Sequence, residues 1–307
     1  MKTILRAALV SIIVFGVTTT NPLRVFAATA TEKIGVIMLH PKWSYPARIE
    51  SWYKKIGKEK VFRKLQRKCG KGPWVCSEDE AVIGHERNDL SLLAIDLYED
   101  GFLIESPHCA WSKKKKYSNT VDGSLRECVV PRITLLRERG AEKIVVFGKS
   151  LGANAAMRAG VIIDGIDAIV AMAPGHRPEK RNMRDKHDAD VRHARNQVKA
   201  GNGQKITEYL DINQGREKMI EVAAINYLSW FDPDGKAVMA KNAPKFKDNI
   251  AFLWIAGKQD MISDGTGKDI FDSTPANSKS KFFLVEGGHS DVREYGKDVI
   301  IDWLKGL

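Results

Sequence analysis

The sequence predicts an α/β fold in which a mainly parallel sheet of about six strands carries helices on both faces. A chain of 307 residues with 43% hydrophobic content is long enough to bury a sizeable core as one main domain. Along it, short apolar runs rich in β-branched and aromatic residues alternate with helical stretches, which is the pattern of a parallel sheet covered on both sides. The expected strands are Ile34–Leu39, 102–105, 143–147, 168–173, 251–256 and Lys281–Val285.

Helical periodicity fills the connections between these runs. The helix expected over Asp89–Glu99 carries Leu90, Leu93 and Leu97 on one face, as a helix packed on a sheet requires. The other connecting helices are expected at 119–139, 150–160 and 292–304.

The first thirty residues have the composition of a secretory signal peptide. Lys2 and Arg6 form a short basic start, an uncharged run follows over 7–17, and small residues suited to cleavage lie around Ala27. The apolar run is shorter than the roughly 20 residues that cross a bilayer, so a membrane anchor is the weaker interpretation. We expect residues 1–27 to be removed on export to the periplasm or beyond, leaving a domain over 28–307 with no stable membrane insertion.

Two segments exceed the simple alternation of strand and helix. One, at about 48–87, separates the first strand from its helix, and the other, at about 175–246, separates the fourth and fifth strands. Both are far longer than an ordinary connection, and both leave the carboxyl end of a strand, so we expect them to form a lid or cap. Within the second, 217–230 resembles an amphipathic helix with one buried face.

Positive charge is concentrated in the first insertion. The chain has a formal charge of +11, and between residues 51 and 72 nine Lys or Arg stand against one acid. A solvated charged surface is the simplest interpretation, and an anionic substrate, an anionic envelope surface or nucleic acid are the alternatives. No nucleic-acid-binding motif accompanies the charge, so we expect no nucleic-acid partner.

Four cysteines in an exported chain suggest two disulfides, for which three pairings exist. We favour Cys69 with Cys76, because the six residues between them resemble a tight loop, and then Cys109 with Cys128. The spacings lack the paired C-x-x-C pattern of structural zinc, so no metal is expected at these thiols.

A nucleophile motif follows the third expected strand. Gly148-Lys149-Ser150-Leu151-Gly152 matches G-x-S-x-G, with a strand before it and an alanine-rich helix after it. A serine on such a sharp turn projects from the sheet, and the glycines remove Cβ atoms that would collide with neighbouring backbone. Ser150 is therefore the candidate nucleophile.

A serine hydroxyl needs a base, and the base needs an orienting acid. Asp260 lies just past the fifth expected strand, and His289 follows the sixth in a Gly-Gly-His-Ser sequence. Parallel strands build their sites at the carboxyl edge, where both residues would lie. We therefore expect His289 as base and Asp260 as its partner, with Asp264 as the alternative acid.

An acyl-transfer site also needs two N–H groups aimed at the developing oxyanion. One is expected from Leu151, the residue after the nucleophile. The other is expected from the loop after the first strand, His40-Pro41-Lys42-Trp43. Because Pro41 has no N–H, the backbone of Lys42 is the preferred donor and that of Trp43 the reserve.

Four sequence features together resemble the α/β-hydrolase superfamily. They are the strand followed by His-x-x-Trp, the Gly-Lys-Ser-Leu-Gly turn, the Gly-x-x-Asp sequence and the Gly-Gly-His sequence. The resemblance covers 32–307. The chain starts its sheet without two earlier strands, as the compact dienelactone-hydrolase-like members do, and 173–176 and 227–235 are similar to exported bacterial members of unassigned substrate. The resemblance implies the α/β-hydrolase fold, with Ser150, Asp260 and His289 as a catalytic triad. It does not imply a substrate. The family usually has His-Gly where this chain has His40-Pro41.

Four further residues are candidates for contact with substrate. His176 follows an expected strand tip, and Trp43, Trp111 and Trp230 are candidate pocket walls, although core packing is an equally good interpretation of these tryptophans. His187 and His193 lie six residues apart and lack the i, i+4 spacing of a helical metal site, so we expect no metal.

The sequence therefore predicts a serine hydrolase that cleaves a small-molecule carboxylic ester through an acyl-enzyme, without a cofactor. Acyl transfer or peptide cleavage on the same three residues is an alternative. A binding protein that keeps the hydrolase fold without turnover is another, since a fold does not fix a function. The acyl group, the leaving group and the oligomeric state are not predicted.

Overall fold

The computed structural model describes residues 30–44, 89–247, 249–260 and 267–307. The expected signal peptide at 1–27, most of the first insertion at 48–87, Cys69, Cys76 and Asp264 lie outside the described residues. A short 3-10 helix, η1 (Ala30–Lys33), leads into the first strand.

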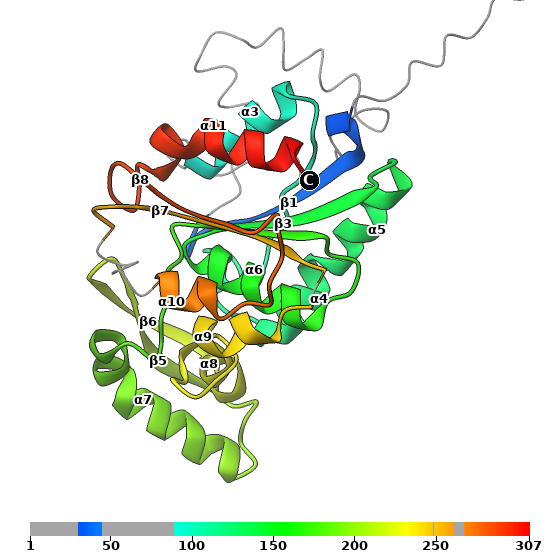
Figure 1. Ribbon diagram of the computed structural model, residues 1–307. Coiled ribbons are helices and arrows are strands. Elements are labelled where there is room, and N and C mark those ends of the chain that lie inside the picture. Colours follow the sequence, from blue (N-terminus) through cyan, green and yellow to red (C-terminus); the bar gives the residue numbers. More distant parts are fainter. Residues whose placement is uncertain (1–29, 45–88, 248, 261–266) are drawn as a thin grey trace, which may run out of the picture.

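One parallel sheet organises the molecule and confirms the predicted fold class (Figure 1). Its six strands run in the spatial order β2-β1-β3-β4-β7-β8, and every pair is parallel. The strands are β1 (Ile34–Leu39), β2 (Leu103–Glu105), β3 (Lys143–Lys149), β4 (Ala168–Met172), β7 (Ala251–Gly257) and β8 (Lys281–Val285). All lie within a residue or two of the predicted ranges.

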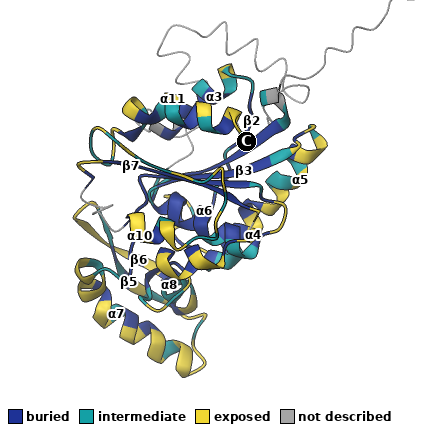
Figure 2. Ribbon diagram, in the orientation of Figure 1, coloured by how far each residue is buried: buried dark blue, intermediate teal, exposed yellow. Residues whose placement is uncertain are grey.

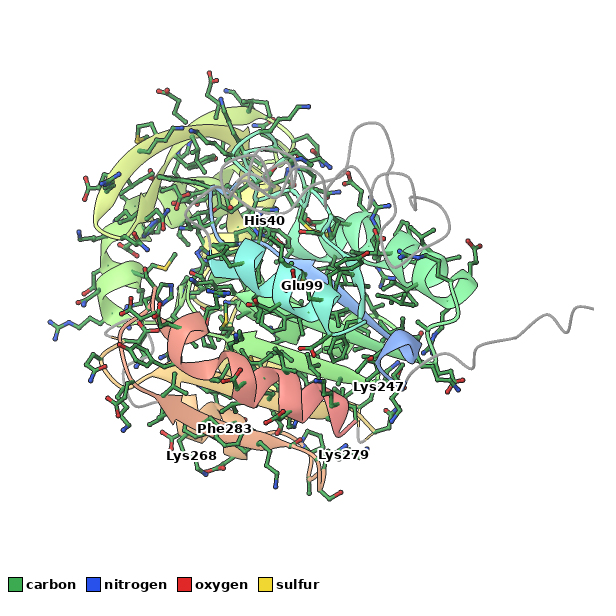
Figure 3. The ribbon with its side chains drawn as sticks, turned by 90° about the horizontal axis from the view of Figure 1, so that it is seen from above. His40, Glu99, Lys247, Lys268, Lys279 and Phe283 are labelled. Carbon is green, nitrogen blue, oxygen red and sulfur yellow. A yellow bond between two sulfur atoms is a disulfide. The ribbon has the colours of Figure 1, made fainter. Side chains whose placement is uncertain are left out.

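Helices cover both faces of this sheet. α3 (Asp89–Glu99) and α11 (Val292–Lys305) lie side by side on one face, which Figure 3 views from above. α4 (Val121–Cys128), α5 (Val130–Glu138) and α6 (Leu151–Ile162) lie on the other. The central strands are apolar along their length because both of their faces are buried, as Figure 2 shows.

The stretch 119–139 forms two helices instead of the single helix predicted. Thr120 caps α4, accepting a hydrogen bond from Gly123 N (3.1 Å). Pro131 lies in the first turn of α5, where its missing N–H does no harm, but it cannot continue the preceding helix. A second helix therefore begins at Val130.

The second insertion forms a subdomain, here called the cap segment (175–246). It contains α7 (Arg181–Lys199), the antiparallel hairpin of β5 (Ile206–Asn213) and β6 (Arg216–Ala223), α8 (Ala224–Phe231), α9 (Met239–Asn242) and η2 (Ala243–Lys245). The helix predicted over 217–230 is wrong in its first half, because Ile220 and Val222 alternate as buried strand residues and only the second half is helical. α7 packs on α8 with its outer side exposed (Figure 2).

Cys109 and Cys128 form a disulfide with a Cα–Cα distance of 5.5 Å, as the sequence predicts. It joins the loop after β2 to the end of α4. The described part of the chain has no free cysteine. A further helix, α10 (Gly267–Asp272), precedes β8. None of the helices in the described ranges has the length and hydropathy that a bilayer crossing requires.

Candidate active site

Strands β1, β3, β7 and β8 bring the candidate catalytic residues to one edge of the sheet. Ser150 directly follows β3, Asp260 lies just past β7, and His289 lies in the loop after β8. The loop after β1 begins at His40, which Figure 3 labels. Because the strands are parallel, their carboxyl ends meet at this edge, and residues far apart in the sequence converge there.

Ser150 occupies the turn between β3 and α6 in a strained conformation. Its φ of 57° and ψ of −120° lie where non-glycine residues rarely do. A Cβ atom on Gly148 would collide with the carbonyl oxygen of Gly152, and one on Gly152 would collide with that of Leu39. The two motif glycines therefore permit a turn that projects the serine from the sheet.

His289 contacts Asp260, as the sequence predicts. His289 Nδ1 lies 2.9 Å from Asp260 Oδ2, and the Asp260 side chain is fully buried whereas that of His289 is 13% exposed. A carboxylate in this place holds the proton on Nδ1 and leaves Nε2 able to accept one. The two loops are tied together by a hydrogen bond from Gln259 N to Gly287 O (3.1 Å).

Ser150 lines a cavity at this edge, but among the described residues no hydrogen bond joins its hydroxyl to His289. Contacts between a nucleophile and its base are often long before substrate binds. The structure thus pairs His289 with Asp260 and places Ser150 at the same edge of the sheet, after β3.

The loop after β1 lies against the start of α6, where the two N–H donors are expected. Leu151 is the first residue of α6, so its N–H has no acceptor within the helix. Lys42 and Trp43 form the turn after Pro41, with φ 54° at Trp43. The aim of these N–H groups at a substrate oxygen stays a prediction.

The Lys42 side chain makes a buried ionic contact for which the sequence holds no local signal. Its Nζ lies 2.5 Å from Asp211 Oδ1 and donates to Ile212 O at 3.0 Å. The Tyr117 hydroxyl donates to Asp211 Oδ2 at 3.1 Å. Burial lowers the pKa of Lys42, opposed by the attraction of Asp211. This contact ties the loop after β1 to strand β5 of the cap segment.

A cavity of about 730 Å³ opens beside Ser150. Its walls are the start of α6, the loop after β4, the first turn of α7 and the turn between β5 and β6. The cap segment thus supplies much of the wall around the candidate nucleophile.

His176, a candidate for contact with substrate, lines this cavity. Its φ is 59° and it is 8% exposed. His176 Nε2 lies 2.7 Å from Trp230 O, so Nε2 carries the proton that this carbonyl accepts. Burial lowers the pKa of His176 well below its usual value, and the ring is neutral at pH 7.

Of the three tryptophans predicted to line the pocket, one lines a cavity and two lie in the core. Trp43 lines a smaller cavity of about 220 Å³, under the ammonium of Lys218 at 5.5 Å from the ring centre. Trp111 and Trp230 are core residues instead of pocket walls, at 0% and 1% exposure. Their indole N–H groups find carbonyl partners inside, which makes full burial of both rings tolerable.

Two buried cationic or titratable groups flank the site. His40 is 1% exposed, and burial lowers its pKa to about 4. Its Nε2 accepts a hydrogen bond from Cys109 N (3.3 Å), and this contact fixes the loop after β1 to the loop after β2. Burial also lowers the pKa of Lys149 to about 8, opposed by the charges of Asp260 and Asp291.

Among the described residues, no group of three or more His, Cys, Asp or Glu is arranged to hold a metal ion. His187 instead stacks on Phe231 with ring centres 5.2 Å apart, and His193 lies near Tyr209 at 5.9 Å.

Solved structures of lipases and esterases resemble this chain. A metagenome-derived lipolytic enzyme is 14% identical, with a TM-score of 0.53 over 90% of this chain and 94% of that chain. A monoacylglycerol lipase from Paleococcus ferrophilus is 18% identical, with a TM-score of 0.51 over 89% and 94% of the two chains. An esterase from Pyrococcus furiosus is 15% identical, with a TM-score of 0.51 over 91% and 84%.

No protein-family model matches the chain, and a search of curated proteins finds no significant match. The parallel sheet, the strained serine turn between β3 and α6 and the likeness to these structures all lead to one architecture. The chain has the α/β-hydrolase fold.

Proposed function

We propose that the protein is a serine hydrolase that cleaves carboxylic esters of small molecules. The observation that carries the proposal is the serine turn: Ser150 has the backbone strain of a nucleophile on a strand-to-helix turn, and it lines a cavity at the edge where Asp260 contacts His289. The likeness in fold to lipases and esterases supports the same class of reaction.

In this proposal Ser150 Oγ attacks the ester carbonyl carbon while His289 Nε2 takes the hydroxyl proton. The resulting oxyanion accepts hydrogen bonds from the N–H groups of Leu151 and Lys42. The C–O bond to the alcohol then breaks, and the alcohol leaves with the proton from His289. Water, deprotonated by the same nitrogen, attacks the acyl-enzyme, and the acid leaves as Ser150 recovers its proton.

The alternative reactions differ in the final acceptor. An alcohol or amine in place of water would make the protein an acyltransferase, and an amide substrate would make it a peptidase. A binding protein without turnover is the alternative from another class. The strained turn favours an enzyme, because strain at a single non-glycine residue costs stability and persists where function requires it.

We also propose that the protein is exported, with residues 1–27 as its leader. The disulfide between Cys109 and Cys128 supports this, because disulfides persist in oxidising compartments. Comparison of the N-terminus of the protein recovered from culture medium or periplasm with that of the cytosolic form tests it.

Hydrolysis of p-nitrophenyl esters of graded chain length tests the activity. Ser150→Ala should fold normally and lose turnover by on the order of 10⁶-fold, as nucleophile knock-outs do. Ser290→Ala is the matched control, because Ser290 is an exposed serine next to His289 and should keep wild-type rates. Equal rates in the wild type and Ser150→Ala would refute the proposal.

A further inference from the structure

The cavity beside Ser150 has a strongly one-sided charge. Its fifteen lining residues include five Lys or Arg, two His, and no Asp or Glu. One of the five is Lys42, which contacts Asp211. The other four are Arg177, Lys180, Arg181 and Lys186, which come from the loop after β4 and the beginning of α7.

The first turn of α7 adds to the positive charge of the cavity wall. Residues 180–183 all line the cavity, the first turn has no acidic residue, and the N-cap side chain of Lys180 makes no capping hydrogen bond. The first N–H groups of a helix have no acceptor within it, and in a helix of 19 residues the dipole places partial positive charge at that end. Such an end favours an anion.

Among the described residues, three of these cations contact an acid that is not part of the cavity wall. Arg177 Nε lies 3.2 Å from Glu179, Arg181 lies 3.5 Å from Asp185, and Lys186 lies 3.6 Å from Glu217. The last two pairs are exposed, and exposed pairs contribute little, so their cations remain available to an anion that enters the cavity.

Two buried imidazoles, His176 and His187, form part of the cavity wall. His176 Nδ1 and His187 Nε2 are buried and have no hydrogen-bond partner within the described part of the chain. The other nitrogen of each ring already bonds a backbone carbonyl, that of Trp230 or Met183. Because each ring donates through its other nitrogen, the unsatisfied nitrogen is a lone-pair acceptor, and the partner it lacks is a hydrogen-bond donor, such as a water or a substrate hydroxyl, and not the anion itself.

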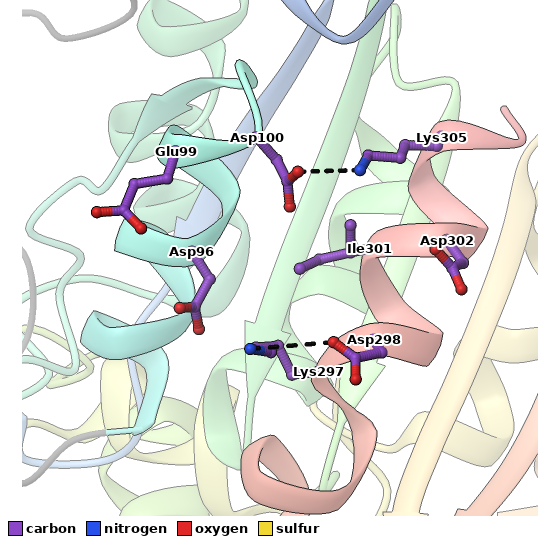
Figure 4. A pocket seen from close by; sticks show the side chains of 8 residues that line it. All are labelled: Asp96, Glu99, Asp100, Lys297, Asp298, Ile301, Asp302 and Lys305. Carbon is purple, nitrogen blue, oxygen red and sulfur yellow. Dashed lines mark hydrogen bonds and ion pairs between the residues drawn. The ribbon is translucent and has the colours of Figure 1, made fainter.

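The cationic lining extends to the adjoining cavity of about 220 Å³, which four lysines line without an acid, but it is not a general property of the described surface. A second cavity, of about 470 Å³ between α3 and α11, is lined by five carboxylates, two lysines and Ile301 (Figure 4). Two of the ion pairs there, Lys305 with Asp100 and Lys297 with Asp298, are drawn in the figure. Acidic residues thus predominate in the cavity between α3 and α11, in contrast to the cavity beside Ser150.

We propose that the cap segment selects anionic esters: substrates with a carboxylate or phosphate group that the beginning of α7 binds, with Lys180 and Arg181 as its principal cations. The ester bond then lies at Ser150, and the anionic group occupies the far end of the same cavity. This inference rests on the proposed hydrolase function and names its substrate class.

A matched pair of substrates tests it. The mono-p-nitrophenyl ester of adipic acid is anionic at one end, and p-nitrophenyl hexanoate has the same chain length without the charge. The wild type should prefer the adipate ester by about ten- to a hundred-fold in kcat/KM, the scale of a charge-assisted contact. The double variant Lys180→Glu/Arg181→Glu should remove or reverse that preference, mainly through KM. Arg184→Glu, on the same helix but outside the cavity wall, should keep it.

Equal kcat/KM for the two esters in the wild type, or an unchanged preference in the double variant, would overturn the inference. Binding of adipate to Ser150→Ala, measured by calorimetry, distinguishes this failure from failure of the proposed function. Adipate binding that the Lys180 and Arg181 changes abolish, without any ester turnover in the wild type, would keep the anion site and overturn the hydrolase. Turnover without charge preference and without adipate binding would overturn only the anion site.

Discussion

Lys42 Nζ lies 2.5 Å from Asp211 Oδ1, with the two side chains 6% and 0% exposed. The contact spans 169 residues and joins the loop that carries the candidate oxyanion donor to strand β5 of the cap segment. One lysine thus contributes its backbone to the loop beside Ser150 and its side chain to the anchorage of the cap. The position of the cap and the geometry of the site are coupled through it.

Asp211→Asn should lower the free energy of unfolding by about 3–5 kcal/mol, because it leaves the Lys42 ammonium buried without a counter-charge. Urea unfolding measures the change. The triple variant Lys42→Met/Tyr117→Phe/Asp211→Leu removes the whole network and should cost less than Asp211→Asn alone. Lys186→Gln, which breaks an exposed pair, is the control and should cost under about 1 kcal/mol. An equal loss of unfolding free energy in Asp211→Asn and Lys186→Gln would show that the buried pair contributes no more to stability than the exposed pair does.

Asp260→Asn should lower kcat by several orders of magnitude, about 10⁴-fold where the orienting acid of a triad is replaced in this way. The amide cannot hold the His289 proton on Nδ1, so Nε2 is no longer reliably the base. Asp264→Asn is the comparison, and it should change kcat little. A larger loss for Asp264→Asn would identify Asp264 as the true partner of His289.

The parallel core was predictable because its strands are buried on both faces and read as continuous apolar runs, as in Ile144–Phe147 of β3. The pairing of Asp260 with His289 followed from the same reasoning, since both residues lie at carboxyl ends of neighbouring strands. The apolar pattern of the strands and the geometry of a parallel sheet therefore predicted the same arrangement of core and site.

The cap segment was harder to predict because its strands are charged and half exposed. The hairpin turn at Gln214-Gly215, with φ of 49° and 78°, was its one local signal, a polar residue and a glycine between two alternating runs. The Lys42–Asp211 contact had no such signal, since a pairing over that separation depends on how the cap docks. The tryptophans were ambiguous because an indole fits a pocket wall and a core equally well until its N–H partner is known.

The protein should lose stability as the pH falls from 6.5 toward 4, in part through His40. Burial holds the His40 pKa at about 4 in the folded state, against 6.5 in the unfolded chain. Between these values the unfolded state binds a proton that the folded state does not, so the contribution of His40 is complete above pH 6.5 and disappears on the way to pH 4. The full loss is roughly 3 kcal/mol, at about 1.4 kcal/mol per pH unit.

The wild type and His40→Gln, unfolded in urea across this pH range, provide the measurement. His176 and His187 also have lowered pKa values and destabilise the fold in the same direction as the pH falls. The variant should therefore keep part of the dependence of unfolding free energy on pH and lose only the part that His40 contributes. Identical slopes in the two proteins would mean that His40 does not titrate as described.

Cys109→Ala/Cys128→Ala should lower the free energy of unfolding by about 3 kcal/mol, since the disulfide closes a loop over a separation of 19 residues. Chemical denaturation without reductant measures it, and peptide mapping without reduction should find the two cysteines joined and Cys69 joined to Cys76. The double variant treated with reductant should lose only what the second disulfide contributes. Wild-type stability in the variant would contradict the role given to this bond.

The central claim is that Ser150 is an activated nucleophile, and a fluorophosphonate probe tests it most directly. Such a probe bonds covalently to a serine that an adjacent base activates, whatever the natural substrate. Mass spectrometry of the labelled wild-type protein should place one adduct on the peptide that contains Ser150. Ser150→Ala should take up no label, and His289→Asn should react far more slowly. A wild-type protein that remains unlabelled, or one labelled at another serine, would contradict the account.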